Sequence, residues 1–334
     1  MKNMKFGILG CGNISDVHVK AISEIEGAEL YAVCDVNETR VNEYAKKHNV
    51  LAFTDYEKML ADENIDAVAI CTPSGMHKNQ ALLALKNKKH VLVEKPMALT
   101  AADCRELCDA AKESEKLITV IFQLRYSDDL KRAKEIIKDE TLGKLAFCDL
   151  YMKYWRDESY FLESAWRGTF EMDGGGALMN QGIHGIDLIH YLFGVPKLIS
   201  ARVKTIAHNI ETEDTAVAIV EYPSGALGVI EGSTSSNPGF HRRIEINGSR
   251  GYMTIVDQTI EKLFVDGEFL INKELETSGG SASDAKATSH TGHVKHYTNF
   301  IRATEGLEEL ISSPEDGYKS VALIEQIYKK SKEI

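Results

Sequence analysis

Residues 6–15, Phe-Gly-Ile-Leu-Gly-Cys-Gly-Asn-Ile-Ser (FGILGCGNIS), decide the fold of this chain. An apolar run that predicts a buried β-strand leads directly into Gly10-Cys11-Gly12-Asn13-Ile14-Ser15, a G-x-G-x-x-S motif followed by a helical stretch. In such a strand–loop–helix unit, Gly10 permits the tight turn and Gly12 lets the backbone approach a pyrophosphate at the helix N-terminus. The segment therefore predicts the dinucleotide-binding loop of a Rossmann domain.

An acidic residue supports this interpretation. The second apolar run ends in Asp35, 23 residues after Gly12, where a ribose-binding carboxylate is expected. Such a carboxylate repels a 2′-phosphate, so NAD is favoured over NADP, although Arg40 could meet that phosphate instead. A structural turn followed by a chance acid is the alternative. The predicted cofactor contacts from this region are Gly10, Gly12, Asn13, Ile14, Asp35 and Arg40.

The rest of the N-terminal third repeats the same pattern. Short runs rich in Val, Ile, Leu and Phe alternate with polar segments long enough for a helix: FGILG, ELYAVCD, DAVAICT, HVLVE and LITVIF. This alternation predicts an α/β domain with a doubly wound parallel sheet over residues 1–122.

After Arg125 the pattern changes. A helix is predicted over 128–138 and a long strand over 144–155, and further strand-like runs beyond Lys197 are joined by short turns such as Pro223-Ser224-Gly225. We expect residues 123–334 to form an α+β domain for substrate binding and oligomerisation, built on an open, mainly antiparallel sheet. The helical segments 293–304 and 314–330 could pack back on the first domain. An uncovered sheet face predicts a homodimer or homotetramer.

The composition and net charge of the chain indicate which class of partner it binds. The chain has 334 residues, 43% hydrophobic and 27% charged, with a formal charge of −11. An acidic surface disfavours nucleic acid and anionic membranes and favours a small-molecule partner. The N-terminal apolar run is too short for a signal peptide, and six scattered cysteines indicate reduced thiols in the cytoplasm.

Three further segments carry a family resemblance: Cys71-Thr72-Pro73, Glu94-Lys95-Pro96, and Gly174-Gly175-Gly176 leading to His184. These segments, in this order, resemble those of the glucose–fructose oxidoreductase / inositol dehydrogenase / MocA (Gfo/Idh/MocA) family. The resemblance extends over nearly the whole chain. The resemblance implies a two-domain NAD(P)-dependent oxidoreductase acting on CH–OH groups of sugars, polyols, cyclitols or nucleotide sugars.

The resemblance makes Lys95 the catalytic lysine. An ammonium group at the end of a strand can hold the reacting hydroxyl and stabilise oxyanion character as hydride leaves. The alternative is a surface lysine paired with Glu94.

The segment 174–194 supplies the second catalytic candidate. At 100° per residue in an α-helix, Asn180, His184 and Asp187 fall within roughly 60° of one another. His184 is the candidate general base, because imidazole accepts a proton near neutral pH. Asp187 would orient its ring or cap a neighbouring structural group; a structural histidine is the alternative role for His184.

Asn180 departs from the family pattern, since many members carry Asp at this place. An amide can hydrogen-bond a substrate hydroxyl but adds no negative charge. Asn here is similar to some family enzymes that act on nucleotide-linked sugars. We nevertheless count Asn180 with the catalytic residues.

The resemblance also assigns a wider set of contacts. The cofactor contacts it implies are Thr72, Pro73, His77, Glu94, Lys95, Gln123, Trp166 and Arg167. The substrate contacts it implies are Lys95, Tyr154, Asn180, His184 and His293. Trp166 could equally be a core residue, and Tyr154, Arg156 and Tyr160 could be exposed loop residues.

No metal site is expected. His290 and His296 point 240° apart around a helix, so they cannot share one metal face with His293. Cys104 and Cys108 have no second ligand pair.

The expected function is NAD-dependent hydride transfer between a secondary alcohol and its ketone. The sequence is also compatible with two other functions. One is an NAD-dependent glycosidase with transient redox chemistry, and the other is a non-catalytic NAD-binding sensor.

Overall fold

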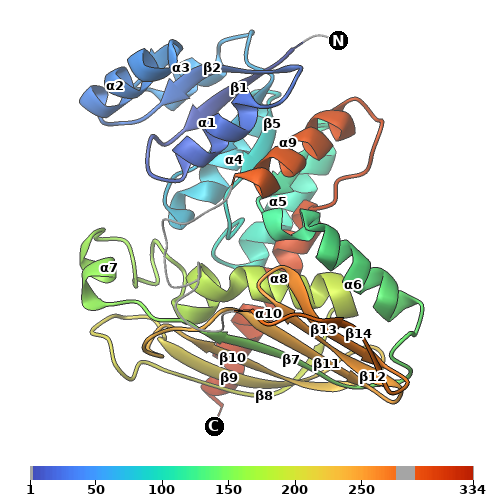
Figure 1. Ribbon diagram of the computed structural model, residues 1–334. Helices are drawn as coiled ribbons and strands as arrows, with labels where there is room; N and C mark the ends of the chain where they lie inside the picture. Colours follow the sequence, from blue (N-terminus) through green and yellow to red (C-terminus); the bar gives the residue numbers. More distant parts are fainter. Residues whose placement is uncertain (1–2, 276–289, 334) are drawn as a thin grey trace. The chain divides into compact units, whose positions relative to one another are not determined.

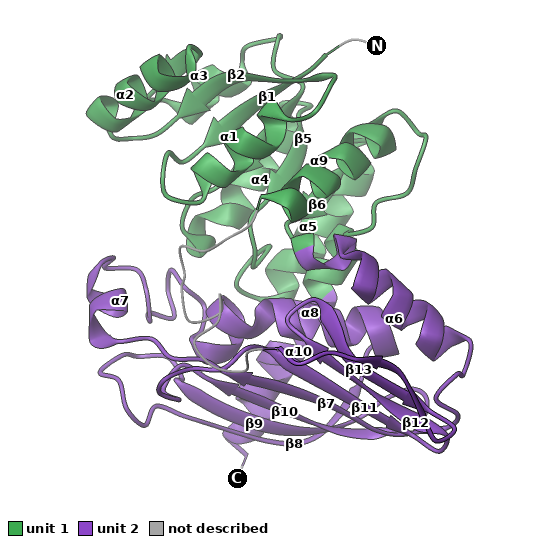
Figure 2. Cartoon of the chain, viewed as in Figure 1, with its two compact units in different colours: residues 1–123, 288–318 green, residues 124–287, 319–334 purple. Residues whose placement is uncertain are grey.

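The computed structural model describes residues 3–275 and 290–333. Figure 2 shows two compact units. The first comprises Met1–Gln123 and Thr288–Tyr318, and the second comprises Leu124–Ala287 and Lys319–Ile334. Each unit has its own sheet.

The first unit contains a six-stranded parallel sheet in the order β3-β2-β1-β4-β5-β6. Its strands are β1 (Met4–Leu9), β2 (Ala28–Cys34), β3 (Leu51–Phe53), β4 (Ala67–Ile70), β5 (His90–Val93) and β6 (Ile118–Val120). The five apolar runs predicted as strands all form, and the doubly wound parallel sheet is confirmed. Only β3 was not predicted, because its three residues are too few to form a recognisable apolar run.

Helices surround this sheet (Figure 1). They are α1 (Ser15–Ser23), α2 (Glu38–His48), α3 (Tyr56–Leu60), α4 (His77–Lys86), α5 (Ala101–Ser114) and α9 (Thr291–Thr304), with the short 3-10 turn η1 (Ser74–Met76). A second 3-10 turn, η2 (Gln123–Tyr126), begins at the last residue of the stretch Met1–Gln123 and continues into the second unit. Helix α9 packs on α1 although it is distant in sequence. The ring of Tyr297 on α9 meets that of Phe6 on β1 edge-on, with centroids 5.2 Å apart. Helix α9 therefore contributes to the core of the dinucleotide-binding unit.

The second unit contains an eight-stranded sheet in the order β14-β13-β12-β11-β7-β10-β9-β8. Its strands are β7 (Leu145–Lys153), β8 (Lys197–Lys204), β9 (Thr215–Glu221), β10 (Leu227–Ser233), β11 (Arg243–Gly248), β12 (Gly251–Val256), β13 (Thr259–Val265) and β14 (Glu268–Asn272). The pairs are antiparallel except β7 with β10, so the predicted mainly antiparallel sheet is confirmed. The predicted turn at 223–225 joins β9 to β10, with Gly225 at φ +84°.

One face of this sheet is covered by helical segments (Figure 1). These are α6 (Asp128–Lys138), the π-helical segment η3 (Ala177–Gly182), α8 (Ile183–Phe193) and the C-terminal part of α10 (Pro314–Ser331). The short helix α7 (Glu158–Leu162) lies in the connection before them. Alternation along β7 buries Cys148, Leu150 and Met152, whereas Phe147 on the other face is 51% exposed. Among residues 3–275 and 290–333, this second face of the sheet is therefore open at Phe147.

Within residues 3–275 and 290–333, no helix is long and apolar enough to cross a membrane. All six cysteines are free and buried. Burial raises the pKa of Cys11 to about 12, so the thiol in the glycine-rich loop is a poor nucleophile.

Candidate active site

The loop between β1 and α1 is shaped by its two glycines. Gly10 has φ +95°, and a Cβ there would lie 2.8 Å from the carbonyl oxygen of Cys71 on the neighbouring strand end. A Cβ on Gly12 would meet no atom within 4 Å. Ile14, at the N-terminus of α1, makes no side-chain capping hydrogen bond. Open space above Gly12 and an uncapped helix N-terminus are the features that a bound pyrophosphate requires, so these residues fit a dinucleotide.

The predicted ribose-binding acid lies against the same loop. Asp35 Oδ2 accepts a hydrogen bond from the Cys11 backbone N–H at 2.9 Å, and Oδ1 accepts one from the Asn37 N–H at 2.9 Å. Arg40 Nη1 lies 3.5 Å from Asp35 Oδ2, while its side chain is 55% exposed. The carboxylate predicted to bind the ribose and the guanidinium that could meet a 2′-phosphate are therefore neighbours just after β2.

Lys95 follows the last residue of β5 by two positions. The preceding Glu94 is buried, and its Oε2 accepts a hydrogen bond from the Lys95 N–H at 3.2 Å. Glu94 Oε1 lies 3.0 Å from Nε2 of His18 on α1, and His18 Nδ1 lies 2.7 Å from the Tyr297 hydroxyl on α9. His18 on α1, which is itself in contact with Tyr297 on α9, thus meets the carboxylate that accepts the Lys95 N–H.

Burial and mutual contacts shift the pKa values of the groups in this cluster. Burial alone would raise the pKa of Glu94, but its contacts with His18 and His293 hold that pKa well below its usual value. Burial lowers the pKa of His18, against the opposing effect of its contact with Glu94. An ionised carboxylate only accepts, so His18 donates Nε2–H to Glu94, while its Nδ1 atom contacts the Tyr297 hydroxyl.

His293 completes the cluster. It is buried, and its Nε2 atom lies 3.9 Å from Glu94 Oε1. The ligand-type atoms of His18, Glu94 and His293 lie within 4.8 Å of one another. His18 and Glu94 are joined directly at 3.0 Å, whereas neither ring nitrogen of His293 has a hydrogen-bond partner among residues 3–275 and 290–333.

His77 connects two strand ends. The ring is buried, with Nδ1 2.7 Å from the Pro96 carbonyl oxygen and Nε2 2.9 Å from that of Thr72. Thr72 Oγ1 also donates to Gln80 Oε1 at 2.5 Å. His77 therefore ties the turn after β4 to the lysine turn after β5 through backbone atoms. Pro73 stands beside Thr72 at the N-terminus of η1, and Gln123 lies at the end of this unit, against Gly292.

In the second unit, the triple glycine has a packing reason. A Cβ on Gly175 would lie 2.1 Å from the Tyr328 hydroxyl oxygen, and one on Gly176 would lie 2.0 Å from the Glu213 carbonyl oxygen. The Glu213 carboxylate accepts hydrogen bonds from the N–H groups of Gly176 at 2.9 Å and Leu178 at 2.8 Å. Glu213 thereby satisfies the first N–H groups of the helical segment that carries Asn180.

That segment is not one continuous α-helix. Residues Ala177–Gly182 form a π-helical turn, and α8 begins only at Ile183. The predicted α-helix over 174–194 is therefore wrong in its first part, because a π-turn holds more residues per turn than the 100° arithmetic assumes. The arithmetic holds for His184 and Asp187, which both lie in α8.

Asp187 has a structural partner. Its Oδ1 and Oδ2 atoms accept from Arg125 Nη2 at 2.6 Å and Nε at 2.8 Å, and both side chains are buried. The geometry matches the second role predicted for Asp187, which is to cap a neighbouring structural group. His184 lies half-buried in the first turn of α8.

Asn180 belongs to a chain of side-chain contacts. Its Nδ2 donates to Asp173 Oδ1, and its Oδ1 accepts from Gln181 Nε2 at 2.6 Å. Gln181 Nε2 also donates to the Tyr160 hydroxyl at 2.7 Å, and Gln181 Oε1 accepts from Arg156 Nη2 at 2.6 Å. Asp173 was not predicted, although an acid directly before the glycine run was a signal that could have been used.

The residues predicted in the connecting segment are packed around Tyr160. The guanidinium carbons of Arg167 and Arg156 lie 4.1 Å and 5.4 Å from its ring centroid. Trp166, 5.9 Å from the Arg167 guanidinium, is half-buried. Tyr154 is buried, so it is not an exposed loop residue.

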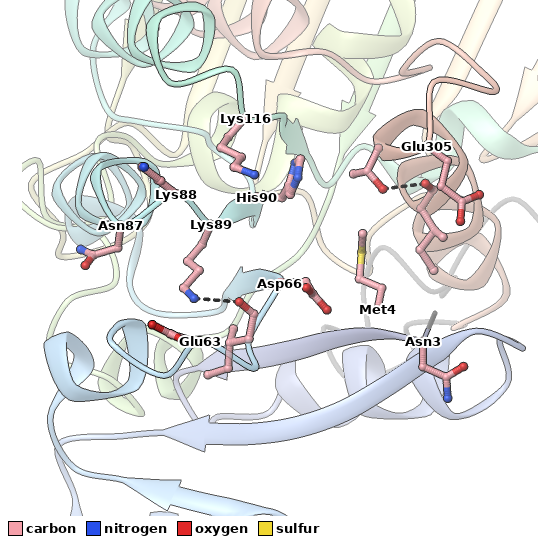
Figure 3. A pocket seen from close by; sticks show the side chains of 13 residues that line it. Asn3, Met4, Glu63, Asp66, Asn87, Lys88, Lys89, His90, Lys116 and Glu305 are labelled. Atoms are coloured by element: carbon pink, nitrogen blue, oxygen red, sulfur yellow. Dashed lines mark hydrogen bonds between the residues drawn. The ribbon is translucent and has the colours of Figure 1, made fainter. Parts of the chain in front are cut away.

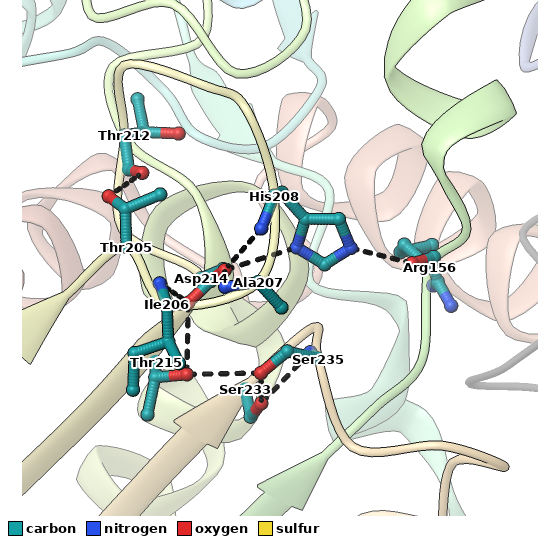
Figure 4. Close-up of polar contacts among 10 residues, drawn as sticks. All are labelled: Arg156, Thr205, Ile206, Ala207, His208, Thr212, Asp214, Thr215, Ser233 and Ser235. Carbon is teal, nitrogen blue, oxygen red and sulfur yellow. Dashed lines mark hydrogen bonds and ion pairs between the residues drawn. The ribbon is translucent and has the colours of Figure 1, made fainter.

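Figure 4 shows how the backbone of Arg156 is held. His208 Nε2 lies 2.8 Å from the Arg156 carbonyl oxygen, and His208 Nδ1 lies 3.2 Å from Asp214 Oδ2. Burial would raise the pKa of Asp214, but N–H bonds from Ala207, Ile206 and His208 outweigh burial and lower it. His208 and Asp214 gave no sequence signal, because nothing local links them to Arg156.

The other candidates are placed elsewhere. His290 pairs with Glu24 at 2.8 Å and His296 with the Thr119 hydroxyl at 2.7 Å, so these two histidines do not converge with His293 on one ion. A pocket lined by charged residues, among them Lys88, Lys89 and Asp66, lies near the amino ends of β1, β4 and β5 (Figure 3). That edge is opposite the glycine loop, which follows the carboxyl end of β1.

These features can be compared with known proteins. Residues 4–122 match an oxidoreductase family with an NAD-binding Rossmann fold, and residues 130–254 match the GFO/IDH/MocA C-terminal domain. The chain is 30% identical over 259 residues to the myo-inositol 2-dehydrogenase of Thermotoga maritima, covering 74% of each chain. It is also 30% identical over 262 residues to the scyllo-inositol 2-dehydrogenase (NADP(+)) IolU of Bacillus subtilis, covering 78% of this chain and 77% of that one.

A solved structure is similar over nearly the full length. The WlbA dehydrogenase of Bordetella pertussis, in complex with NADH and UDP-GlcNAcA, superposes with a TM-score of 0.87 at 29% identity, covering 99% of this chain and 97% of that one. Fold and dinucleotide loop together define an NAD-binding oxidoreductase. The chain belongs to the GFO/IDH/MocA family.

Proposed function

We propose that the protein interconverts a secondary alcohol of a sugar, cyclitol or nucleotide sugar and the corresponding ketone, with NAD as the cofactor. When bound, NAD supplies the hydride acceptor. The protein's own groups bind and orient the alcohol and move its hydroxyl proton.

The observation that carries this proposal is the position of Lys95 within the first unit. The glycine loop follows the carboxyl end of β1, and Lys95 follows that of β5, with only β4 between them. Neighbouring strands are roughly 5 Å apart, so the lysine turn and the dinucleotide loop lie about 10 Å apart along one sheet edge. Ligands of open parallel sheets bind at this edge.

Three side chains have roles in this reaction. Lys95 would hold the reacting oxygen and stabilise its developing negative charge. His184 would take the hydroxyl proton, since an imidazole titrates close to neutral pH. Asn180 would hydrogen-bond a neighbouring hydroxyl and so fix which carbon reacts.

The substrate class is supported by the relatives. Two of them are inositol 2-dehydrogenases, and the WlbA structure holds UDP-GlcNAcA. The amide at Asn180 and the arginines Arg156 and Arg167 in the same unit favour a polar sugar derivative rather than an apolar alcohol.

NAD is proposed over NADP because the Asp35 carboxylate stands at the end of β2. Its negative charge would repel a 2′-phosphate. The relative IolU is named as an NADP(+) enzyme, and Arg40 beside Asp35 gives this chain one cation that could serve the same purpose.

Self-association through the open sheet face belongs to the same proposal. Phe147 pairs with Leu227 across β7 and β10, and Val229 pairs with Ile219 across β10 and β9. Three of these four side chains are exposed, Leu227 by 47%. An apolar patch of this kind is usually covered by a partner, and a second copy would give a homodimer or homotetramer.

Unpaired cysteines support a reducing compartment such as the cytoplasm.

A substrate screen tests the proposal. Purified protein is incubated with inositols, free sugars, polyols and nucleotide sugars, each with NAD and with NADP, and reduced nicotinamide is followed by its absorbance. We expect net reduction of NAD with at least one member of these classes. Turnover of a glycoside without net absorbance change would favour transient redox chemistry instead, and NAD binding without any turnover would favour a sensor.

A further inference from the structure

Asn180 is held by a carboxylate seven residues before it in the chain. Asp173 is 2% exposed and Asn180 is 9% exposed, so the contact between them is buried. Asp173 Oδ1 accepts from Asn180 Nδ2, and Asp173 Oδ2 accepts from the Gly168 N–H at 2.9 Å. Each carboxylate oxygen therefore has a donor of its own.

This contact determines which way the Asn180 amide faces. Only the NH₂ end can approach a carboxylate, so the Oδ1 end is turned toward Gln181 Nε2, 2.6 Å away. Gln181 is oriented in turn, because its Oε1 accepts from Arg156 Nη2 at 2.6 Å. The hydrogen bonds therefore form a chain that begins at a cation and ends at an anion, and at each contact a donor faces an acceptor. The chain consists of Arg156, Gln181, Asn180 and Asp173.

We propose that Asp173 is a positioning residue for the reaction, acting through Asn180, and that positions 173 and 180 form one carboxylate–amide unit with a single negative charge. This inference rests on the proposed function, in which Asn180 contacts a substrate hydroxyl. Hydrogen bonding to the carboxylate polarises the amide and removes its freedom to flip. In this unit the amide at position 180 is held in one orientation, and the negative charge lies on the carboxylate at position 173.

The proposal can be tested by exchanging the two side chains, because each substitution changes which hydrogen-bond donors and acceptors are present at positions 173 and 180. The Gly168 N–H and the Asn180 NH₂ approach different oxygens of residue 173, so in D173N one of these donors faces an NH₂ group instead of an acceptor. In N180D, two carboxylates meet in a buried contact and cannot both be charged without a large penalty. In the double variant D173N/N180D, the amide now at position 173 can accept from Gly168 and donate to the carboxylate now at position 180, which in turn accepts from Gln181.

The experiment is a double-mutant cycle of these four proteins, measured for Tm, kcat, substrate KM and NAD affinity. We expect each single variant to lose kcat on the order of 10-fold or more, with NAD affinity unchanged, since a misplaced contact group costs rate rather than cofactor binding. We expect the double variant to recover Tm fully and kcat to within about 3-fold of the original protein.

Two results would overturn the positioning role. One is a D173N protein with the original kcat and KM. The other is a double variant that recovers Tm but keeps the low kcat of D173N, which would make the unit purely structural. If the original protein turns over no alcohol at all, the proposed function fails together with the positioning role, whereas Tm coupling between the two sites still reports whether they form one unit.

Discussion

The Nε2 atom of His18 on α1 lies 3.0 Å from Oε1 of Glu94 at the end of β5, in a buried contact between residues 76 positions apart. Glu94 also accepts the N–H of Lys95. This one carboxylate therefore connects the helix that follows the dinucleotide loop with the turn that carries the proposed catalytic lysine.

Glu94→Gln should destabilise the protein by about 2 kcal/mol, because a buried charge-assisted hydrogen bond is lost. Since the pKa of Glu94 is lowered by folding, its stabilising effect is full above the usual glutamate value of 4.5 and declines as the pH falls below it. Urea unfolding across this range measures the effect. The matched control is Glu24→Gln, because Glu24 pairs with His290 at 2.8 Å on the surface. Equal effects of the two substitutions would contradict the buried role.

Lys95→Ala should abolish turnover, with kcat falling on the order of 10³-fold, while NAD affinity is largely kept. The lysine contributes charge at the reacting oxygen, whereas the dinucleotide is held by the loop after β1. Stopped-flow or steady-state kinetics and NAD titration measure the two quantities. Lys58→Ala, at an exposed lysine of the same unit, is the control. Near-normal turnover of the Lys95 variant would remove this lysine from the mechanism.

Asp35→Ser should shift the preference between cofactors toward NADP on the order of 10-fold, since the repulsion of a 2′-phosphate is removed. Arg40→Ala tests the role of Arg40, whose Nη1 atom lies 3.5 Å from Asp35 Oδ2. If Arg40 binds a 2′-phosphate, its loss weakens NADP and leaves NAD unchanged. Ratios of kcat/KM for NAD and NADP are the measurement, and an unchanged ratio in Asp35→Ser argues against a ribose-binding role for Asp35.

Asp187→Asn should cost about 3 kcal/mol of folding stability, because the buried Arg125 guanidinium loses its charged partner. NAD affinity should not change, since neither Asp187 nor Arg125 is among the predicted cofactor contacts. Asp266→Asn is the control, as Asp266 pairs with Arg250 through two hydrogen bonds on the surface of the same unit. A stable Asp187 variant that loses only kcat would instead support an orienting role toward His184.

Leu227→Lys combined with Phe147→Lys should shift the protein toward monomers, because it places charges in the apolar patch on the open sheet face. Light scattering coupled to size-exclusion chromatography measures the mass. Leu162→Lys, an exposed position outside the sheet, should leave the mass unchanged. Persistence of the original mass in the double variant would move the interface elsewhere.

Local patterns were sufficient for most of the fold. The apolar runs before Gly10, Asp35 and Lys95 predicted β1, β2 and β5, because buried parallel strands have near-continuous apolar sequences. Short strands such as β3 and the shift to a π-turn at 177–182 were missed. Their geometry depends on packing against neighbouring elements rather than on their own residues.

The candidate site was predictable only in part. Motifs pointed to Lys95, His184 and the glycine loop, and the resemblance supplied their proposed roles. The contacts around Glu94, Asp187 and Asn180 became visible only in the fold. They are made by His18 and Tyr297 near Glu94, by Arg125 at Asp187 and by Asp173 at Asn180.

The sequence by itself determined the parallel and antiparallel sheets, the dinucleotide loop and the family, because strand patterning and glycine spacing are local properties of the chain. The tertiary structure alone decided which buried charges face each other and which way each amide and imidazole is turned. Those choices depend on side chains up to 279 residues apart, such as His18 and Tyr297. Only folding brings such groups within hydrogen-bonding distance and removes the water that would otherwise compete for them.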